Sequence, residues 1–316
     1  MALHHSHDHN GHSHDDGHHH HHVDPTTQGR TFVVTIALNT IFVVVEFVFG
    51  LIANSTALMA DAGHNLSDVL GLLLALGAAI LARRTPSGRF TYGLRSTSIL
   101  AALTNAMFLM VACGGIALEA IQRFAQPHVV AGLTVSLVAS IGIVVNGASA
   151  WLLVKGSKGD LNVRGAYLHM LADTAVSLGV AIAGVAMLYT GWYWLDPVIS
   201  LVIVVVIVIG TWGLLRESLQ LALNAIPEHI NAAAVEDYLR QCNGVTDIHD
   251  LHIWGMSTTE TALTVHLVMP EGHPSDRFIA EVADELRGRF GIGHATIQVE
   301  TGDELHPCAL APDHVV

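Results

Sequence analysis

Two stretches of this chain decide its fold: ALMADAGHNLSDVLG, residues 57–71, and YLHMLADTAVSLG, residues 167–179. Both are largely apolar, yet each holds a histidine and an aspartate four positions apart, His64 with Asp68 and His169 with Asp173. An acidic side chain at the centre of a membrane helix costs about 2.5–3.5 kcal/mol on insertion scales. Each of these residues therefore needs a reason to be there, and the two stretches are predicted to be membrane helices that carry a site.

The composition indicates a membrane protein. Of the 316 residues, 51% are hydrophobic and 13% are charged, whereas soluble domains carry about 25% charged residues. Six apolar stretches are near the ~20 residues that cross the hydrocarbon core of a bilayer. We expect them to form a membrane domain of six helices within residues 31–221, at residues 31–53, 57–82, 94–123, 129–154, 163–190 and 195–219. The net charge of −13 argues against a nucleic-acid partner.

Positive charge is concentrated on one side of these predicted helices. Only Arg123 falls on the opposite side. Because basic residues stay in the cytoplasm, both termini are predicted to be cytoplasmic. The basic residues on the first side are Arg30, Arg83, Arg84, Arg89, Arg95, Lys155, Lys158, Arg164 and Arg216.

The first 30 residues form a low-complexity segment of His, Asp, Gly and Ser, which cannot bury a core and is predicted to be disordered. It contains no recognisable signal peptide. Half of the 22 histidines of the chain lie in its first 22 residues. A metal-collecting tail explains this pattern, and a purification tag at residues 18–22 is the alternative.

A soluble domain is expected at residues 226–302, followed by a tail at 303–316, because charged residues become frequent after the last apolar stretch. The periodicity predicts helix, strand, strand, helix and strand, at residues 232–242, 245–254, 262–269, 275–290 and 295–300. This order suits an α+β domain with a split β-α-β, ferredoxin-like fold.

The two histidine–aspartate pairs favour a zinc site. Residues four apart project from one face of a helix, so contact between the two helices would bring His64, Asp68, His169 and Asp173 together. Two imidazoles and two carboxylates suit tetrahedral zinc and balance its charge, whereas magnesium prefers six oxygens. A structural polar network between helices is the alternative.

Other polar residues lie within the predicted helices. Hydrogen bonding between helices, or an interfacial position, explains them at least as well as a functional role. Asp61 could also be an outer ligand or a proton acceptor, and Glu119 is expected to pair with Arg123. The residues are Glu46, Asp61, Asn105, Asn146 and Asp196.

Five motifs resemble those of the cation diffusion facilitator family. They are SxALMADAGHNLSD (55–68), FTYGLRS (90–96), GAYLHMLADT (165–174), DIHDLHIW (247–254) and HATIQVE (294–300). The resemblance implies six membrane helices, a cytoplasmic metallochaperone-like domain and a homodimer. It also implies export of zinc through a bacterial inner membrane, driven by proton influx, with the four residues named above as the transport site. A His-Asp pair on each helix is similar to the zinc-selective members.

The resemblance also suggests metal ligands in the cytoplasmic domain. His249, His266 and Glu300 match family positions that bind metal. His252 is expected on the same strand face as His249, as a fourth ligand or an exposed histidine. A second metal could use His306 and Cys308 from the tail. Metal bound here is expected to clamp two protomers together and raise transport.

Other classes of function remain as alternatives. An intramembrane zinc hydrolase would need an open coordination position and commonly an HExxH motif, which the chain lacks, so no enzyme activity is expected. A membrane-anchored metal sensor or storage protein is the second alternative. Within the transporter class, cadmium, cobalt, nickel, manganese and iron are alternative substrates. No ATP-binding or phosphorylation motif is present, so ion gradients are expected to supply the energy.

Overall fold

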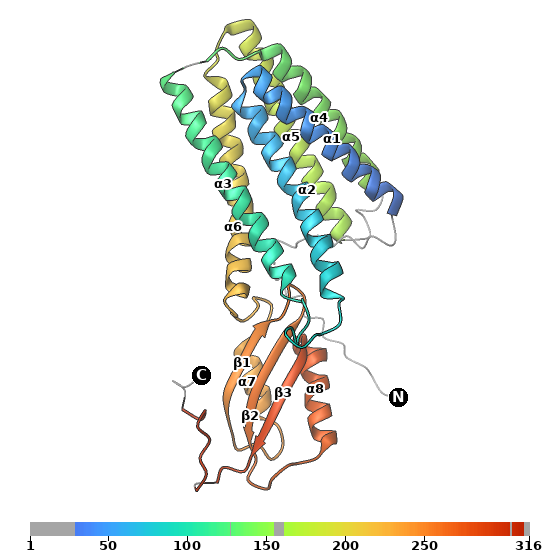
Figure 1. Cartoon of the computed structure of the whole chain (residues 1–316), viewed down its shortest axis with the longest axis vertical. Helices are drawn as coiled ribbons and strands as arrows, with labels where there is room; N and C mark the ends of the chain where they lie inside the picture. The colour runs from blue at the N-terminus through green and yellow to red at the C-terminus, as the bar shows by residue number, and fades with distance from the viewer. Residues whose placement is uncertain (1–28, 127, 155–160, 304, 313–316) are drawn as a thin grey trace, which may run out of the picture.

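The structure is a computed structural model that describes residues 29–126, 128–154, 161–303 and 305–312 (Figure 1). The predicted His-rich tail lies almost wholly outside these residues, as do Lys155 and Lys158. A long helical domain is joined end to end with a smaller α+β domain (Figure 1).

The helical domain consists of six long helices, as predicted. Five of them are long and apolar enough to cross a membrane, and the described apolar part of α1, Asn39–Ala53, is shorter. The predicted boundaries are correct to within a few residues. The helices are α1 (Gly29–Ala53), α2 (Thr56–Ala82), α3 (Thr97–Ala125), α4 (Gly132–Leu153), α5 (Leu161–Thr190) and α6 (Leu195–Ala222).

Helix α2 is central to this domain, because it packs against α1, α3, α5 and α6. Helices α3 and α6 pair on one side, and α4 pairs with α5 on the other (Figure 1). Large apolar side chains such as Ile52, Val111 and Ile209 point outward and are about two-thirds exposed or more. Such a surface fits lipid, which is itself apolar, and would be unfavourable in water.

A carboxylate from α6 caps the start of α2. The Asp196 side chain accepts hydrogen bonds from the Thr56 backbone N–H at 2.7 Å, the Thr56 hydroxyl at 2.7 Å and the Ala57 N–H at 3.4 Å. The Ser55 hydroxyl also donates to it, while Ser55 caps the Leu58 N–H at 3.2 Å. The first N–H groups of a helix have no partner within the helix, and a negative charge there is favoured by the helix dipole. Asp196 therefore fixes α6 against α2.

The same end of the domain holds Arg123, which is almost buried. It donates to the Asn54 backbone oxygen, to Asn54 Oδ1 at 3.0 Å and to Glu119 Oε1 at 2.6 Å. Asn54 has a positive φ of 55° in the turn between α1 and α2. The expected Glu119–Arg123 pair is thus present, and Arg123 also holds this turn.

The α+β domain has the predicted order of elements. They are α7 (Ala232–Arg240), β1 (Asp247–Gly255), β2 (Thr261–Val268), α8 (Asp276–Phe290) and β3 (Ile292–Glu300). The sheet order is β1-β2-β3, with β1 antiparallel and β3 parallel to β2. One detail differs from the expectation. Strands β2 and β3 are direct neighbours, so the β-α-β unit is not split by another strand.

The two faces of this sheet have different roles. Leu263, Val265 and Leu267 of β2 belong to a buried core with Val235 of α7 and Leu286 of α8. Because side chains alternate along a strand, the even-numbered residues of β2 point to the opposite face. The helices therefore cover one face of the sheet, and Thr264 and His266 of β2 lie on the other.

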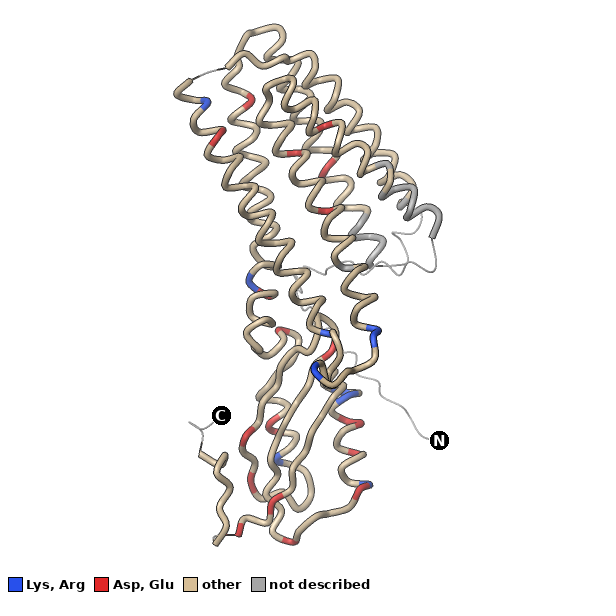
Figure 2. Tube along the Cα trace, viewed as in Figure 1, with Lys and Arg blue, Asp and Glu red and all other residues tan. Residues whose placement is uncertain are grey.

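The two domains meet at the loop between α2 and α3. Arg95 Nη1 lies 2.5 Å from Glu260 Oε2, and the Thr258 N–H donates to Ser98 Oγ at 3.1 Å. The Tyr92 ring contacts the His294 ring edge-on, at 5.6 Å between centroids. Figure 2 shows basic residues gathered near this junction. The arginine-rich loop and the α+β domain therefore lie at the same end of the helical domain.

We expect Asp196→Ala to lower the free energy of unfolding by roughly 2–4 kcal/mol, because it leaves buried N–H and hydroxyl donors at the start of α2 without an acceptor. Chemical unfolding of the purified protein in detergent measures this. Asp196→Asn, which keeps one acceptor oxygen, should cost less. An unchanged unfolding free energy in the alanine variant would show that the cap is not stabilising.

Candidate metal centres

The four residues predicted to converge in the membrane domain do so, between α2 and α5. His169 Nε2 lies 3.0 Å from Asp68 Oδ2 and 3.6 Å from Asp173 Oδ2. His64 Nε2 lies 3.4 Å from Asp173 Oδ1 and 3.8 Å from Asp68 Oδ2. Each carboxylate therefore contacts both imidazoles, one on its own helix and one on the other.

These separations are close to those between the ligand atoms of a zinc ion. Zinc bonds of about 2.0–2.1 Å to nitrogen and oxygen place tetrahedral ligand atoms about 3.3 Å apart. The four histidine–aspartate separations lie between 3.0 and 3.8 Å. The ligand atoms of His64, Asp68 and His169 also lie within 4.8 Å of one another. Asp173 lies outside that three-residue group, but its Oδ1 faces His64 and its Oδ2 faces His169.

The burial of the four side chains is unequal. Asp173 is 3% exposed, whereas the side chains of Asp68 and His169 are 34% and 37% exposed. Asp173 Oδ2 is buried and accepts no hydrogen bond from any residue that the structure describes. A buried carboxylate oxygen without a donor is unfavourable unless a cation satisfies it. The cluster is therefore suited to hold either a metal ion or protons on its imidazoles.

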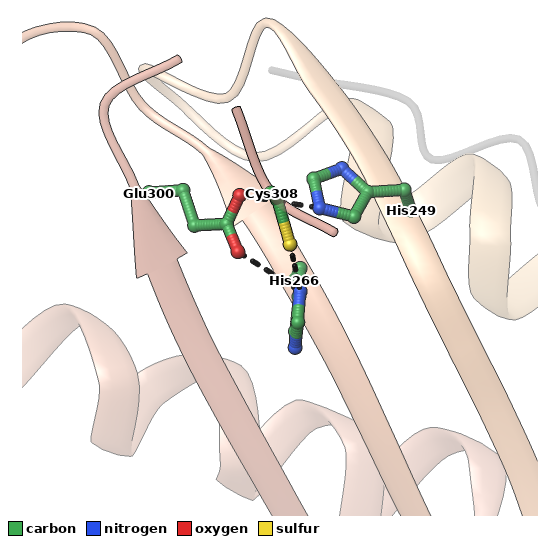
Figure 3. Close-up of side chains that lie close together, drawn as sticks. All are labelled: His249, His266, Glu300 and Cys308. Carbon is green, nitrogen blue, oxygen red and sulfur yellow. Dashed lines mark hydrogen bonds and ion pairs between the residues drawn. The ribbon is translucent and has the colours of Figure 1, made fainter. Parts of the chain in front are cut away.

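The second cluster lies on the helix-free face of the α+β domain, where four side chains meet (Figure 3). His249 comes from β1, His266 from β2, Glu300 from the end of β3 and Cys308 from the segment after it. His249 Nε2 lies 3.2 Å from Glu300 Oε2, and His266 Nδ1 lies 2.9 Å from Glu300 Oε1. Cys308 Sγ lies 3.5 Å from His266 Nδ1. Imidazole, carboxylate and thiolate are all zinc ligands.

Strand register brings the two histidines together. His249 is the partner of His266 in the β1–β2 ladder, and His252 is the partner of Thr264. A bulge lies between them, where Asp250 has a positive φ of 50°. The bulge adds one residue to β1, so His252 shares a strand face with His249 although it stands three positions later.

Asp250 is a site residue that the sequence analysis missed. Its Oδ2 lies 3.4 Å from His266 Nε2, and its Oδ1 lies 2.9 Å from His252 Nε2. A carboxylate on the second ring nitrogen fixes the orientation of a histidine ligand. In the sequence, the position of this acidic residue between two histidines of the motif DIHDLHIW was the signal that could have identified it. His252 contacts Asp250 and is not part of the four-residue cluster.

The tail residues are placed differently from expectation. Cys308, which was expected in a second site with His306, lies against His266 in the first cluster. His306 is 84% exposed and contacts Asp303 at 2.9 Å. A separate site from His306 and Cys308 therefore has no geometric support among the described residues.

The surroundings shift the pKa of two side chains of the cytoplasmic cluster, Glu300 and Cys308. Burial tends to raise the pKa of Glu300, but hydrogen bonds from Cys308 and Gln298 and the nearby His249 and His266 outweigh it, so the pKa is lowered. The hydrogen bond to Glu300 raises the pKa of the Cys308 thiol. Glu300 is therefore ionised and ready to bind a cation, whereas Cys308 must lose a proton first.

Family profiles of known proteins match both domains of this chain. The profile described as "Cation efflux transmembrane domain" matches residues 32–221, and that described as "Cation efflux protein, cytoplasmic domain" matches residues 227–302. This chain belongs to the cation efflux family. The resemblance to cation diffusion facilitators is thereby confirmed.

Bacterial relatives of this cation efflux protein match over most of its length. The zinc transporter ZitB of Escherichia coli is 34% identical over 290 residues, 91% of this chain and 92% of that protein. The metal cation efflux system protein CzcD of Cupriavidus metallidurans is 35% identical over 302 residues, 95% of this chain and 92% of that protein. The "Cadmium, cobalt and zinc/H(+)-K(+) antiporter" of Bacillus subtilis is 32% identical over 286 residues, 89% of this chain and 92% of that protein.

If the cytoplasmic cluster binds zinc, Cys308→Ser should weaken that binding by about tenfold or more, because a thiolate ligand is lost. Zinc titration of the full chain measures this in an Asp68→Ala, Asp173→Ala background, which removes the carboxylates of the membrane cluster. Cys242→Ser is the matched control, since Cys242 contacts the Tyr238 carbonyl, away from the cluster. Equal affinities in the Cys308 and Cys242 variants would remove Cys308 from the ligand set.

Proposed function

We propose that this cation efflux protein exports zinc from the cytoplasm in exchange for protons, through a site formed by His64, Asp68, His169 and Asp173. The single observation that carries the proposal is the set of four histidine–aspartate separations of 3.0–3.8 Å within and between two membrane helices. Two relatives are named as a zinc transporter and as a cadmium, cobalt and zinc antiporter, which supports a divalent metal as substrate.

The chemistry of the ligands supports zinc as the main substrate. Two imidazoles and two carboxylates give four nitrogen and oxygen ligands, and the two carboxylates balance the charge of the ion. Four protein ligands leave no open position for an activated water, so the set suits carrying an ion rather than hydrolysis. Cadmium and cobalt are the alternative substrates that the name of the B. subtilis relative suggests.

The same four groups can exchange metal for protons. Zinc requires neutral imidazoles, so zinc and protons compete for His64 and His169. A histidine ordinarily titrates near pH ~6.5, which lies close to physiological pH. When the site faces the cytoplasm, zinc displaces protons, and when it faces out, protons displace zinc. Alternating access of the site to the two sides then couples the two fluxes.

The orientation follows from the positive charge. Arg83, Arg84, Arg89 and Arg95 lie in or beside the loop that contacts the α+β domain. Basic residues near membrane helices favour the cytoplasmic side. We therefore place the α+β domain and both termini in the cytoplasm, beneath a bacterial inner membrane.

The α+β domain is proposed to bind zinc as a regulator and to form a homodimer. The helix-free face of its sheet carries His249, His266 and Glu300. The family profile that matches residues 227–302 is that of a dimerisation domain, which supports a homodimer. Contacts such as Arg95–Glu260 give this domain a direct connection to the start of α3.

Asp173→Ala should reduce zinc uptake into inverted membrane vesicles with an acidic interior by about tenfold or more, because the most buried ligand of the site is lost. A zinc-sensitive dye inside the vesicles measures the initial rate. Glu119→Gln is the control, since this acid pairs with Arg123 at the far end of the domain. Uptake at the wild-type rate in the Asp173 variant would refute the assigned site. An initial rate of zinc uptake that is the same with and without the pH gradient would refute proton exchange.

Combined His249→Ala and Glu300→Ala substitutions should raise the zinc concentration that gives half-maximal uptake, because the regulatory site no longer fills. Zinc binding at the membrane cluster should persist. The matched variant is His252→Ala, which removes a histidine of the same strand that lies outside the four-residue cluster. The regulatory role would be disproved by the same zinc dependence in all three proteins.

A further inference from the structure

Two more acids lie inside the membrane domain, beside the proposed transport site. Glu46 of α1 and Asp61 of α2 are both 0% exposed. Neither acid is one of the four residues of the proposed transport site. A fully buried pair of carboxyl groups is costly in lipid unless the two groups are neutralised or hydrogen-bonded.

The protein supplies too few donors for this pair. Asn65 Nδ2 donates to Glu46 Oε2 at 3.2 Å, and Ser177 Oγ donates to Asp61 Oδ2 at 3.2 Å. The other two oxygens, Glu46 Oε1 and Asp61 Oδ1, are buried and receive no hydrogen bond from the described part of the chain.

Asp61 and Asn65 are four residues apart on α2 and so share one face of that helix. Glu46 contacts Asn65, which places the Glu46 carboxyl group beside that of Asp61. An ionised carboxylate only accepts hydrogen bonds. Two ionised groups in this arrangement would repel each other and leave their oxygens unsatisfied. One proton shared between them supplies the missing donor and removes one of the two charges.

The charged groups that face this pair belong to the proposed zinc ligands. Ser177, which donates to Asp61, is four residues after Asp173 on α5, and His64 is three residues after Asp61 on α2. These spacings place both proposed ligands on the helix faces that carry the pair, where their charges act on it. Helix α4, which also packs against α1, has no ionisable residue within Gly132–Leu153. The pair is thus electrostatically linked to the zinc site without touching the metal.

We propose that Glu46 and Asp61 form a second proton-binding site of the exchange cycle, separate from the imidazoles that bind zinc. This rests on the proposed function. In the zinc-free state one proton is shared between the two carboxyl groups. When zinc binds, that O–H bond breaks, the electron pair stays on the carboxylate and the proton leaves to water.

The coupling follows from charge. A negative charge near the site favours a divalent cation, and the proton on the pair removes that charge. Zinc and the shared proton therefore oppose each other, and this coupling is reciprocal. On the acidic side of the membrane, proton return to the pair weakens the hold on zinc and assists its release.

The test counts the protons released when zinc binds to the purified protein in detergent. Calorimetric titration in buffers of different ionisation enthalpy gives this number. Wild-type protein should release about one proton more per zinc than Asp61→Asn or Glu46→Gln. Each variant removes one carboxyl group but keeps a side chain of the same shape that can donate to the remaining acid. Glu119→Gln, the matched control, should release as many protons as wild type.

Infrared difference spectroscopy provides a second measurement on the wild-type protein. Zinc should remove a carbonyl band of a protonated carboxyl group, and Glu46→Asp, which keeps two acids, should retain this band at a shifted frequency. Zinc binding with equal proton release in wild type and both amide variants would overturn the proton site alone. Failure of wild-type protein to bind zinc in the membrane domain would overturn the proposed function, and this inference with it.

Discussion

Two carboxylates placed among apolar helices are the constraint on which the membrane domain depends. Neither Asp68 nor Asp173 can be solvated by lipid, so each must find partners within the protein. Each carboxylate finds one imidazole on its own helix and one on the other helix. The cross-helix contacts fix the relative register of α2 and α5. The groups that make the helices compatible with the membrane are thus the groups available to a zinc ion.

The ends of the helices keep this arrangement in place. Asp196 satisfies the free N–H groups at the start of α2, and Arg123 holds the turn that precedes it. Because α2 carries half of the proposed transport site, both contacts position it at one end. At the other end, Arg95 and Ser98 tie the start of α3 to the α+β domain. A shift of that domain therefore acts on the helices next to α2.

In the α+β domain, the path of the backbone brings the residues of the cytoplasmic cluster together. A regular strand would not have placed Asp250 between His252 and His266, but a bulge with a positive φ does so. The tail then returns over the sheet and brings Cys308 to the histidines. The two clusters differ in chemistry, since the membrane cluster has two carboxylates and the cytoplasmic cluster contains a thiol. This difference is consistent with one site that releases its metal and another that retains it.

The sequence by itself determined the six apolar helices, the order of the α+β domain and the two His-Asp pairs. The helices follow from the length of the apolar stretches. The other two features follow from local periodicity, because residues four apart on a helix and two apart on a strand share a face. Only the tertiary structure decided the contacts between distant segments. Examples are the Asp196 cap on α2, the bulge at Asp250, the place of Cys308 and the contact of Glu46 with Asn65. Helix rotation, strand register and the path of the tail set these contacts, and none of the three is encoded by spacing along the chain.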